Sequence, residues 1–312
     1  MGLILILSGL GFVALPGLAR PLGRRLTPRL WAYFCIAGLS IGVLVFEFGL
    51  LLYAAPTVLR ALGIPGLAAT CRRMLGLLVP GGTLSGLAAL SLGLTVMGLA
   101  AYGWAESLRI RRLARVQAKL SAPATFGEYQ VAVLTTDEIV AWSVDGVPGQ
   151  VVISTGLVAQ LSQEELAAVL AHETAHLDHN HYRYLVLAGI LRRALWFFPL
   201  VYSSIAALRG TLERWADEVA VGTEEGRRNS LRRALLHVAA EITGTGVAAF
   251  SEADSVIERL EALDAPPPRL NAASLSLLWA PGVALGLLST AGFSVWLGDF
   301  RTLIEVASRC PI

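Results

Sequence analysis

The chain has few charged residues and no cysteine pair of the kind that holds a metal ion. Only 15% of its 312 residues are charged and 55% are hydrophobic, whereas about a quarter of a soluble protein is charged. The mean hydropathy is +0.62. No C-x-x-C pattern is present, which argues against a cysteine metal site. The net charge of +2 comes without a long basic stripe, so no nucleic-acid partner is expected. We therefore expect an integral membrane protein.

Four segments are apolar and long enough to cross about 30 Å of hydrocarbon: 2–19, 31–55, 82–104 and 275–298. The first could instead be a cleaved signal peptide, but it has no basic n-region and no convincing cleavage site, which favours an uncleaved span. Glycines spaced four apart predict close helix packing, either within a bundle or in a homo-oligomer. These pairs are Gly38/Gly42, Gly82/Gly86 and Gly282/Gly286.

Basic residues indicate the orientation, because they collect on the cytoplasmic side of a membrane. One cluster follows the first span and the other follows the third: Arg20, Arg24, Arg25 and Arg29, then Arg109, Arg111, Arg112, Arg115 and Lys119. We expect a multi-pass protein of the plasma membrane, with residues 105–274 in the cytoplasm and both termini outside. Cys35 would lie in a span. Cys71 and Cys310 would share the oxidising side, either as a disulfide or as two unrelated thiols.

The segment between the third and fourth spans predicts both helices and strands. Residues 105–120 read as a basic helix at the membrane surface. Three Val- and Ile-rich stretches, 131–134, 138–144 and 150–154, predict a small antiparallel sheet. Ser162 and Glu165 form a capping-box pattern, and no Pro or Gly follows before His181, so one continuous helix is expected. Two further helices are predicted at 228–240 and 253–264.

The capped helix carries H-E-x-x-H at His172, Glu173 and His176. Positions i and i+4 share a helix face, so both imidazoles can bind one zinc ion. Glu173, on the flank of that face, can act as a general base towards water. The alternative is a pair of histidines on a solvated face, because the five-residue pattern also occurs without a metal. His179 and His181 are expected at the surface or near the lipid headgroups.

A catalytic zinc has three protein ligands and one open position. Glu213 is the best candidate for the third ligand. Asp217, one turn further on, is expected to orient a ligand histidine; the alternative is a solvated acidic face. The apolar segment 184–208 separates the two motifs. A single crossing there would place Glu213 on the wrong side of the membrane, so we expect a membrane-dipping helical pair. His237 could stabilise an oxyanion or be an ordinary core histidine.

The stretch TGLVAQLSQEELAAVLAHETAH resembles the active-site helix of membrane-bound gluzincins. These include HtpX-type quality-control peptidases, CAAX prenyl proteases and BlaR/MecR antirepressor peptidases. Their E-x-x-x-D motif matches Glu213 to Asp217, so the resemblance also implies that Glu213 is a ligand. It further implies that a strand of the sheet pairs with the substrate; here that stretch is Ile139, Val140, Ala141, Trp142, Ser143 and Val144. One departure is His181, where HtpX-type proteins often have an aspartate.

These patterns together predict an α+β, predominantly α-helical integral membrane protein. Four transmembrane helices would accompany a zincin-like metallopeptidase domain at 105–274, and 299–312 would form an external tail. The arrangement looks most like the BlaR/MecR type in a short form. We expect a Zn²⁺-dependent endopeptidase that cleaves a protein or peptide substrate at the cytoplasmic face of the bilayer, with a regulatory role. The alternatives are HtpX-like quality control and a non-catalytic zinc-bearing scaffold or sensor.

Overall fold

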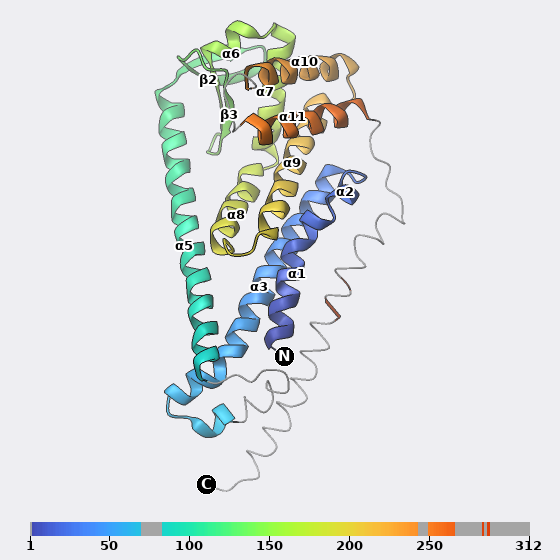
Figure 1. Cartoon of the computed structure of the whole chain (residues 1–312). Helices are drawn as coiled ribbons and strands as arrows, with labels where there is room; N and C mark the ends of the chain where they lie inside the picture. Colours follow the sequence, from blue (N-terminus) through green and yellow to red (C-terminus); the bar gives the residue numbers. More distant parts are fainter. Residues whose placement is uncertain (1, 70–82, 243–248, 266–282, 284–285, 288–312) are drawn as a thin grey trace.

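The molecule has an apolar helical end and an end that carries a small sheet (Figure 1). The computed structural model describes residues 2–69, 83–242, 249–265, 283, 286 and 287. Three long helices run side by side from the apolar end towards the sheet: α1 (Gly2–Leu18), α3 (Pro28–Ala61) and α5 (Thr83–Leu120). A short helix, α2 (Arg20–Gly23), connects α1 to α3 near the sheet end.

Two helices among the described residues, α3 and α5, are long and apolar enough to cross a membrane by length and composition. The sequence predicted four. Helix α1 is apolar but has only 17 residues, and nearly all of segment 275–298 lies outside the described residues. The α+β class and the helical majority are confirmed, whereas the described part of the chain supports two candidate spans.

Glycines allow α1 and α3 to approach closely. A Cβ atom on Gly42 would lie 2.7 Å from the carbonyl oxygen of Gly9 and 2.7 Å from a Val13 methyl group. Since real Cβ atoms do not come so near to backbone oxygen, both helices require small residues at this crossing. The predicted glycine contact at Gly42 therefore lies between two helices of the same chain.

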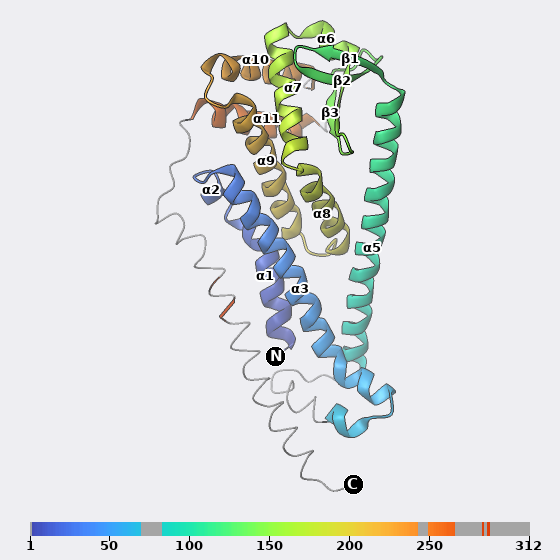
Figure 2. The same ribbon diagram turned by 180° about the vertical axis from the view of Figure 1, so that it is seen from behind.

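Helix α5 continues without a break from its apolar half into the basic segment 105–120 (Figure 2). The helix predicted at 105–120 is therefore the second half of a longer helix, and its place at a membrane surface stays a prediction. No proline interrupts residues 83–120, and the basic half is rich in Ala, Leu and Arg, which are strong helix formers. The helix ends beside the sheet, where Arg115 pairs with Asp145 at 2.7 Å. The long helix thus joins the apolar end directly to the sheet.

The sheet has four strands in the order β1-β2-β4-β3. They are β1 (Ala122–Phe126), β2 (Tyr129–Leu134), β3 (Ala141–Val144) and β4 (Gln150–Ser154). Strands β2 and β4 are parallel, whereas the other two pairings are antiparallel. The predicted purely antiparallel sheet is therefore wrong. The sequence analysis also missed β1, whose Pro123 and two alanines have low strand propensity and are tolerated at an edge.

Helix α6 (Thr155–Gln160) leads from β4 to α7 (Gln163–Asp178), the helix that carries the two histidines. The predicted capping box is confirmed: the Glu165 N–H donates to Ser162 Oγ at 3.3 Å, and the Ser162 N–H donates to Glu165 Oε2 at 3.0 Å. The helix does not run on to His181 as predicted. Asn180 has a positive φ of 54°, a conformation that asparagine tolerates better than most residues, and it ends the helix.

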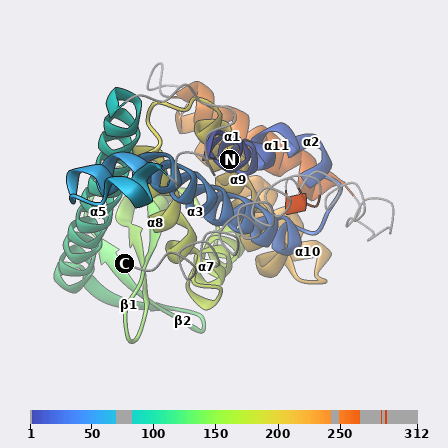
Figure 3. The same cartoon turned by 90° about the horizontal axis from the view of Figure 1, so that it is seen from below.

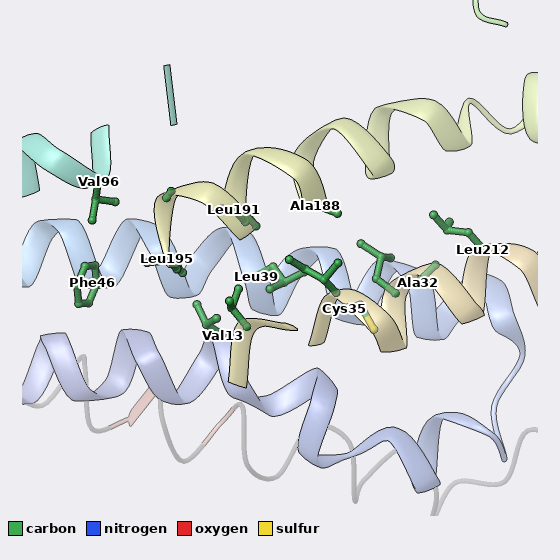
Figure 4. Close-up of a cluster of buried hydrophobic side chains, with 14 of the residues drawn as sticks. Val13, Ala32, Cys35, Leu39, Phe46, Val96, Ala188, Leu191, Leu195 and Leu212 are labelled. Atoms are coloured by element: carbon green, nitrogen blue, oxygen red, sulfur yellow. The ribbon is translucent and has the colours of Figure 1, made fainter. Parts of the chain in front are cut away.

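The apolar segment between the two motifs forms a helical hairpin. Helix α8 (His181–Ala194) leads away from the sheet and α9 (Leu200–Val221) returns, with Pro199 at the turn. The hairpin packs into one core with α1, α3 and α5, as Val13, Leu39, Leu191 and Leu212 illustrate (Figure 4). Figure 3 shows α8 between α5 and α9. The predicted helical pair is present, and it brings the chain back to α7.

A serine ties α9 to the backbone of α1. The Ser204 hydroxyl is fully buried; it donates to the Val13 carbonyl at 2.7 Å and accepts from the Gly17 N–H at 3.0 Å. Residues 13 and 17 would otherwise bond to each other in a regular helix, so the hydroxyl bridges them. This contact fixes the position of α9 along α1.

Two further helices, α10 (Glu225–Ile242) and α11 (Ala249–Asp264), pack beside α7 and α9. They correspond to the helices predicted at 228–240 and 253–264. Cys35 is buried with a free thiol. The predicted Cys71–Cys310 disulfide lies outside the described residues.

Candidate metal centre

Helices α7 and α9 place two histidines and a carboxylate around one point. The Nε2 atoms of His172 and His176 are 3.1 Å apart. The Glu213 carboxylate lies opposite them, with Oε2 at 3.4 Å from His172 Nε2 and Oε1 at 3.6 Å from His176 Nε2. One ligand atom from each residue lies within 4.8 Å of the others. The hairpin therefore delivers the third candidate ligand that the sequence predicted.

These spacings fit a shared metal ion. Two donors that each lie 2.0–2.1 Å from a tetrahedral ion are separated by about 3.4 Å. The observed separations of 3.1, 3.4 and 3.6 Å bracket that value. Two imidazoles and one carboxylate also form a donor set that suits zinc, and three protein ligands would leave a fourth position for water or substrate. The residues thus fit a mononuclear metal site.

Asp217 contacts the ring nitrogen of His172 that faces away from the candidate metal position. Its Oδ1 lies 2.9 Å from His172 Nδ1, and its side chain is buried. A hydrogen bond from the Nδ1–H to this carboxylate leaves Nε2 with its lone pair towards the metal position, as in carboxylate–histidine–zinc arrangements. Asp217 thus lies where it could orient His172, and the orienting role itself stays a prediction.

Arg259, on α11, is a component of this site that the sequence analysis missed. Its Nε donates to Asp217 Oδ2 at 2.8 Å, and its Nη2 donates to Asp217 Oδ1 at 2.6 Å. Its Nη1 lies 3.2 Å from Glu213 Oε2. This cation compensates two acids that would otherwise lie close together in a buried place. No local pattern around Arg259 marks it, because its partner Asp217 is 42 positions away.

His181 supports the second histidine. Its Nδ1 lies 3.0 Å from His176 Nδ1, and its ring is fully buried, so its expected surface position is wrong. The positive φ of Asn180 turns the chain so that His181 points back under α7. Burial, followed by the nearby His176 and His179, lowers the pKa of His181 to about 3. A neutral ring can accept from the His176 Nδ1–H and so direct His176 Nε2 towards the metal position.

Glu173 lies beside the edge strand β3. Burial and then the Glu213 carboxylate raise its pKa, whereas His172, Arg259 and the Ser143 hydroxyl of β3 oppose that rise. A carboxylate with a raised pKa exchanges protons more readily near neutral pH. Glu173 is thus placed next to the metal ligands and in contact with the strand that was predicted to bind substrate.

The neighbouring charges determine the protonation of the candidate ligands. Burial lowers the pKa of His172, but hydrogen bonds to Asp217 and Glu213 raise it to about 9 overall. Burial lowers the pKa of His176 to about 4. The pKa of Glu213 is about 2, because contact with His172 and the charge of Arg259 outweigh the effect of burial. A metal ion therefore competes with a proton mainly at His172.

One predicted site residue does not join this group. His237, on α10, lies near the start of α7, with its Nδ1 3.7 Å from Glu165 Oε2 and about half of its side chain exposed. It is therefore placed beside the capping box, and neither its oxyanion role nor its core role matches this position. Of the residues predicted to bind substrate, 139–144, the last four form β3 (Ala141–Val144), which packs against α7; their role in substrate binding stays a prediction.

The fold and this donor set define a candidate metallohydrolase centre, and a family comparison agrees. Residues 106–253 match the model of peptidase family M48. The match supports a metallopeptidase of that family, and His172, His176 and Glu213 could hold its metal ion. The matched segment includes α7, α9 and all of α10, and it ends before Arg259. No curated protein and no solved structure gives a significant match to the chain.

Proposed function

We propose that this protein is a zinc-dependent endopeptidase that acts on a protein substrate at the cytoplasmic face of a membrane. The observation that carries the proposal is the convergence of His172, His176 and Glu213 beside Glu173. Asp217 and His181 orient the two histidines from opposite sides. The match to peptidase family M48 supports the peptidase class.

Zinc bound by these three ligands would lower the pKa of water and polarise a peptide carbonyl. Glu173 then serves as the proton carrier. Its carboxylate accepts a proton from the attacking water and passes it to the amine that leaves. Because its pKa is raised, the protonated carboxyl required for the second step is more accessible near neutral pH. Arg259 keeps the charges of Asp217 and Glu213 balanced during both steps.

The edge strand β3 is our proposed binding surface for the substrate backbone. The Ser154 N–H donates to the Val140 carbonyl at 3.0 Å, so the backbone groups of Val140 point towards β4. Facing directions alternate along an antiparallel pair, so the backbone groups of Ala141 and Ser143 point to the outer edge. An extended peptide could pair with them and pass beside Glu173.

A membrane location is supported by α3 and α5, which are long and apolar enough to span a bilayer. We propose that the sheet end lies on the cytoplasmic side, because Arg20, Arg24 and Arg25 lie at that end of α1 and α3 and basic residues favour that side. A regulatory role, such as cleavage of a repressor, and HtpX-like quality control would both use this site. A zinc-bearing scaffold is less favoured, because a structural zinc site has no need for a proton carrier such as Glu173.

The test separates metal binding from chemistry. We expect Glu173→Gln to abolish cleavage of a quenched peptide library by the purified full-length chain while its zinc content is unchanged. Glu164→Gln is the matched control, because Glu164 lies on the same helix with an exposed side chain, and it should retain cleavage. Full activity of the Glu173→Gln variant would refute the mechanism. Comparison of cellular proteomes with wild type and Glu173→Gln would then identify the substrate.

A further inference from the structure

A cavity of about 620 Å³ lies between α2, α9 and α11, apart from the metal ligands. Its lining residues from α2 and from the start of α3 place it where α1 leads into α3, at the sheet end of the molecule (Figure 1). Trp31, Ala207 and Leu263 form apolar parts of its lining. Eight of its eighteen lining residues are charged, so its chemistry differs from that of the apolar core around α1 and α3.

Arginines dominate this cavity. Five of them line it: Arg20, Arg24, Arg25, Arg214 and Arg228. Three glutamates do so as well: Glu218, Glu258 and Glu261. The lining therefore carries excess positive charge. Glu258 already pairs with two of the arginines, at 2.6 Å to Arg20 and 2.7 Å to Arg24, so it has little capacity left for the others.

Two of the remaining arginines have a buried Nε without a hydrogen bond among the described residues: Arg214 and Arg228. Arg228 is partly satisfied, because its Nη1 donates to the Leu263 carbonyl at 2.6 Å and its Nε lies 3.6 Å from Glu225 Oε2. Arg25 and Arg214 form no ion pair within the part of the chain that the structure describes. Glu218 and Glu258 attract Arg214 electrostatically, whereas Arg24 repels it. Guanidinium groups arranged in this way match the oxygen atoms of a phosphate group, which accept several charge-assisted hydrogen bonds.

The position of the cavity indicates where such a phosphate would come from. The apolar part of α1 ends at Leu18, and α3 begins at Pro28, so the α2 connector would lie at headgroup level if these helices cross a bilayer. Basic pockets between helices on the cytoplasmic side are suited to anionic lipid headgroups. The apolar lining could contact the glycerol and the first methylenes of a lipid.

We propose that this cavity binds a phosphate-bearing anion, with Arg25, Arg214 and Arg228 as its contacts, and that an anionic phospholipid headgroup is the physiological source. The site differs from the candidate metal centre, because the side chains of these three arginines form no hydrogen bond or ion pair with His172, His176 or Glu213 within the described residues. It would give the protein a selective lipid contact beside its active end.

The experiment measures equilibrium binding to the full-length chain in a neutral detergent. The probes are short-chain phosphatidylglycerol, phosphatidylcholine of equal chain length and inorganic phosphate. We expect saturable binding of phosphatidylglycerol, with weaker binding of phosphatidylcholine. Arg214→Gln and Arg25→Gln should each weaken the binding of phosphatidylglycerol about tenfold, as expected for the loss of a charge-assisted contact. Because Arg25 is exposed, its replacement tests the site without a folding risk.

Arg112→Gln is the matched control, since it removes one exposed positive charge from α5, outside the cavity. Its affinity for phosphatidylglycerol should equal that of the wild type. Inorganic phosphate could bind where the lipid does not, with the same dependence on Arg25 and Arg214. That result would support the phosphate site and would show that its ligand is a free phosphate and not a lipid headgroup. Equal losses in the Arg112→Gln and Arg25→Gln variants would mean general surface attraction and would overturn the proposal. Binding of none of the probes would also overturn it.

Discussion

Replacement of His181 by leucine should weaken zinc binding and leave the stability of the metal-free protein nearly unchanged. His181 lies 3.0 Å from His176 and contacts it through Nδ1. Loss of such an orienting partner typically lowers metal affinity by about 10- to 100-fold, which corresponds to about 1.4–2.8 kcal/mol. His181→Leu should therefore shift a zinc-binding curve by one to two decades.

The expected change in stability is small because the substitution removes one unpartnered buried nitrogen and creates another. The Nε2 atom of His181 is buried without a partner among the described residues, and such a group costs about 1–3 kcal/mol. Leucine removes that cost. It also leaves His176 Nδ1 without its partner, which adds a cost of the same size. The free energy of unfolding in the absence of metal should therefore change by less than the free energy of zinc binding.

His181→Asn is the matched control. The Oδ1 of asparagine can occupy about the position of the histidine Nδ1 and accept from His176, so zinc affinity should stay close to that of the wild type. Zinc affinity would be measured by competition with a chromogenic chelator on the metal-stripped full-length chain, with denaturant unfolding in parallel. Wild-type zinc affinity in the His181→Leu variant would refute the orienting role. Equal losses with leucine and asparagine would indicate a packing role instead.

Two further predictions concern charges around α7. Arg259→Gln should lower the unfolding free energy of the metal-free protein by about 3 kcal/mol, because the buried Asp217 and the half-buried Glu213 lose their cation. Zinc should reduce this deficit, and equal deficits with and without zinc in denaturant unfolding would contradict this prediction. The pKa of Glu165 is lowered, first by the Ser162 N–H, so its charge stabilises the fold above the ordinary pKa of about 4.3 and ceases to do so as the pH falls. Glu165→Gln should therefore be less stable by about 1 kcal/mol at pH 7, and the difference should shrink as the pH falls through the lowered pKa of Glu165; a difference independent of pH would refute this.

The parts of the site that depend on short-range patterns could be predicted from the sequence. The capping box and the two histidines lie on one helix, and helical periodicity alone places both imidazoles on one face. Glu213 could be found because Asp217 follows it at the same spacing. Both motifs must lie at one site, so segment 184–208 was predicted to return to the side of the first motif. Helices α8 and α9 form that return.

The errors concern long-range contacts and single backbone angles. The parallel pairing of β2 with β4 depends on β3 lying at the far edge, which strand propensities do not encode. Asn180 ends α7 through one positive φ, and this turn buries His181. Arg259 reaches Asp217 only after α11 has packed against α9. Each of these features depends on where distant elements lie in space, and no local pattern in the sequence gives that information.

The bridging Ser204 hydroxyl has a consequence for how the enzyme could be produced and studied. Composition suggests that a recombinant fragment could begin near residue 105, where the apolar helices end. However, α9 carries both Ser204, which hydrogen-bonds to the backbone of α1, and Glu213, nine residues further along the same helix. Nine residues of helix span about 13.5 Å. The helix that presents the third metal ligand is thus anchored by a segment that such a fragment would lack, and the smallest unit able to assemble the centre includes the first helix of the chain.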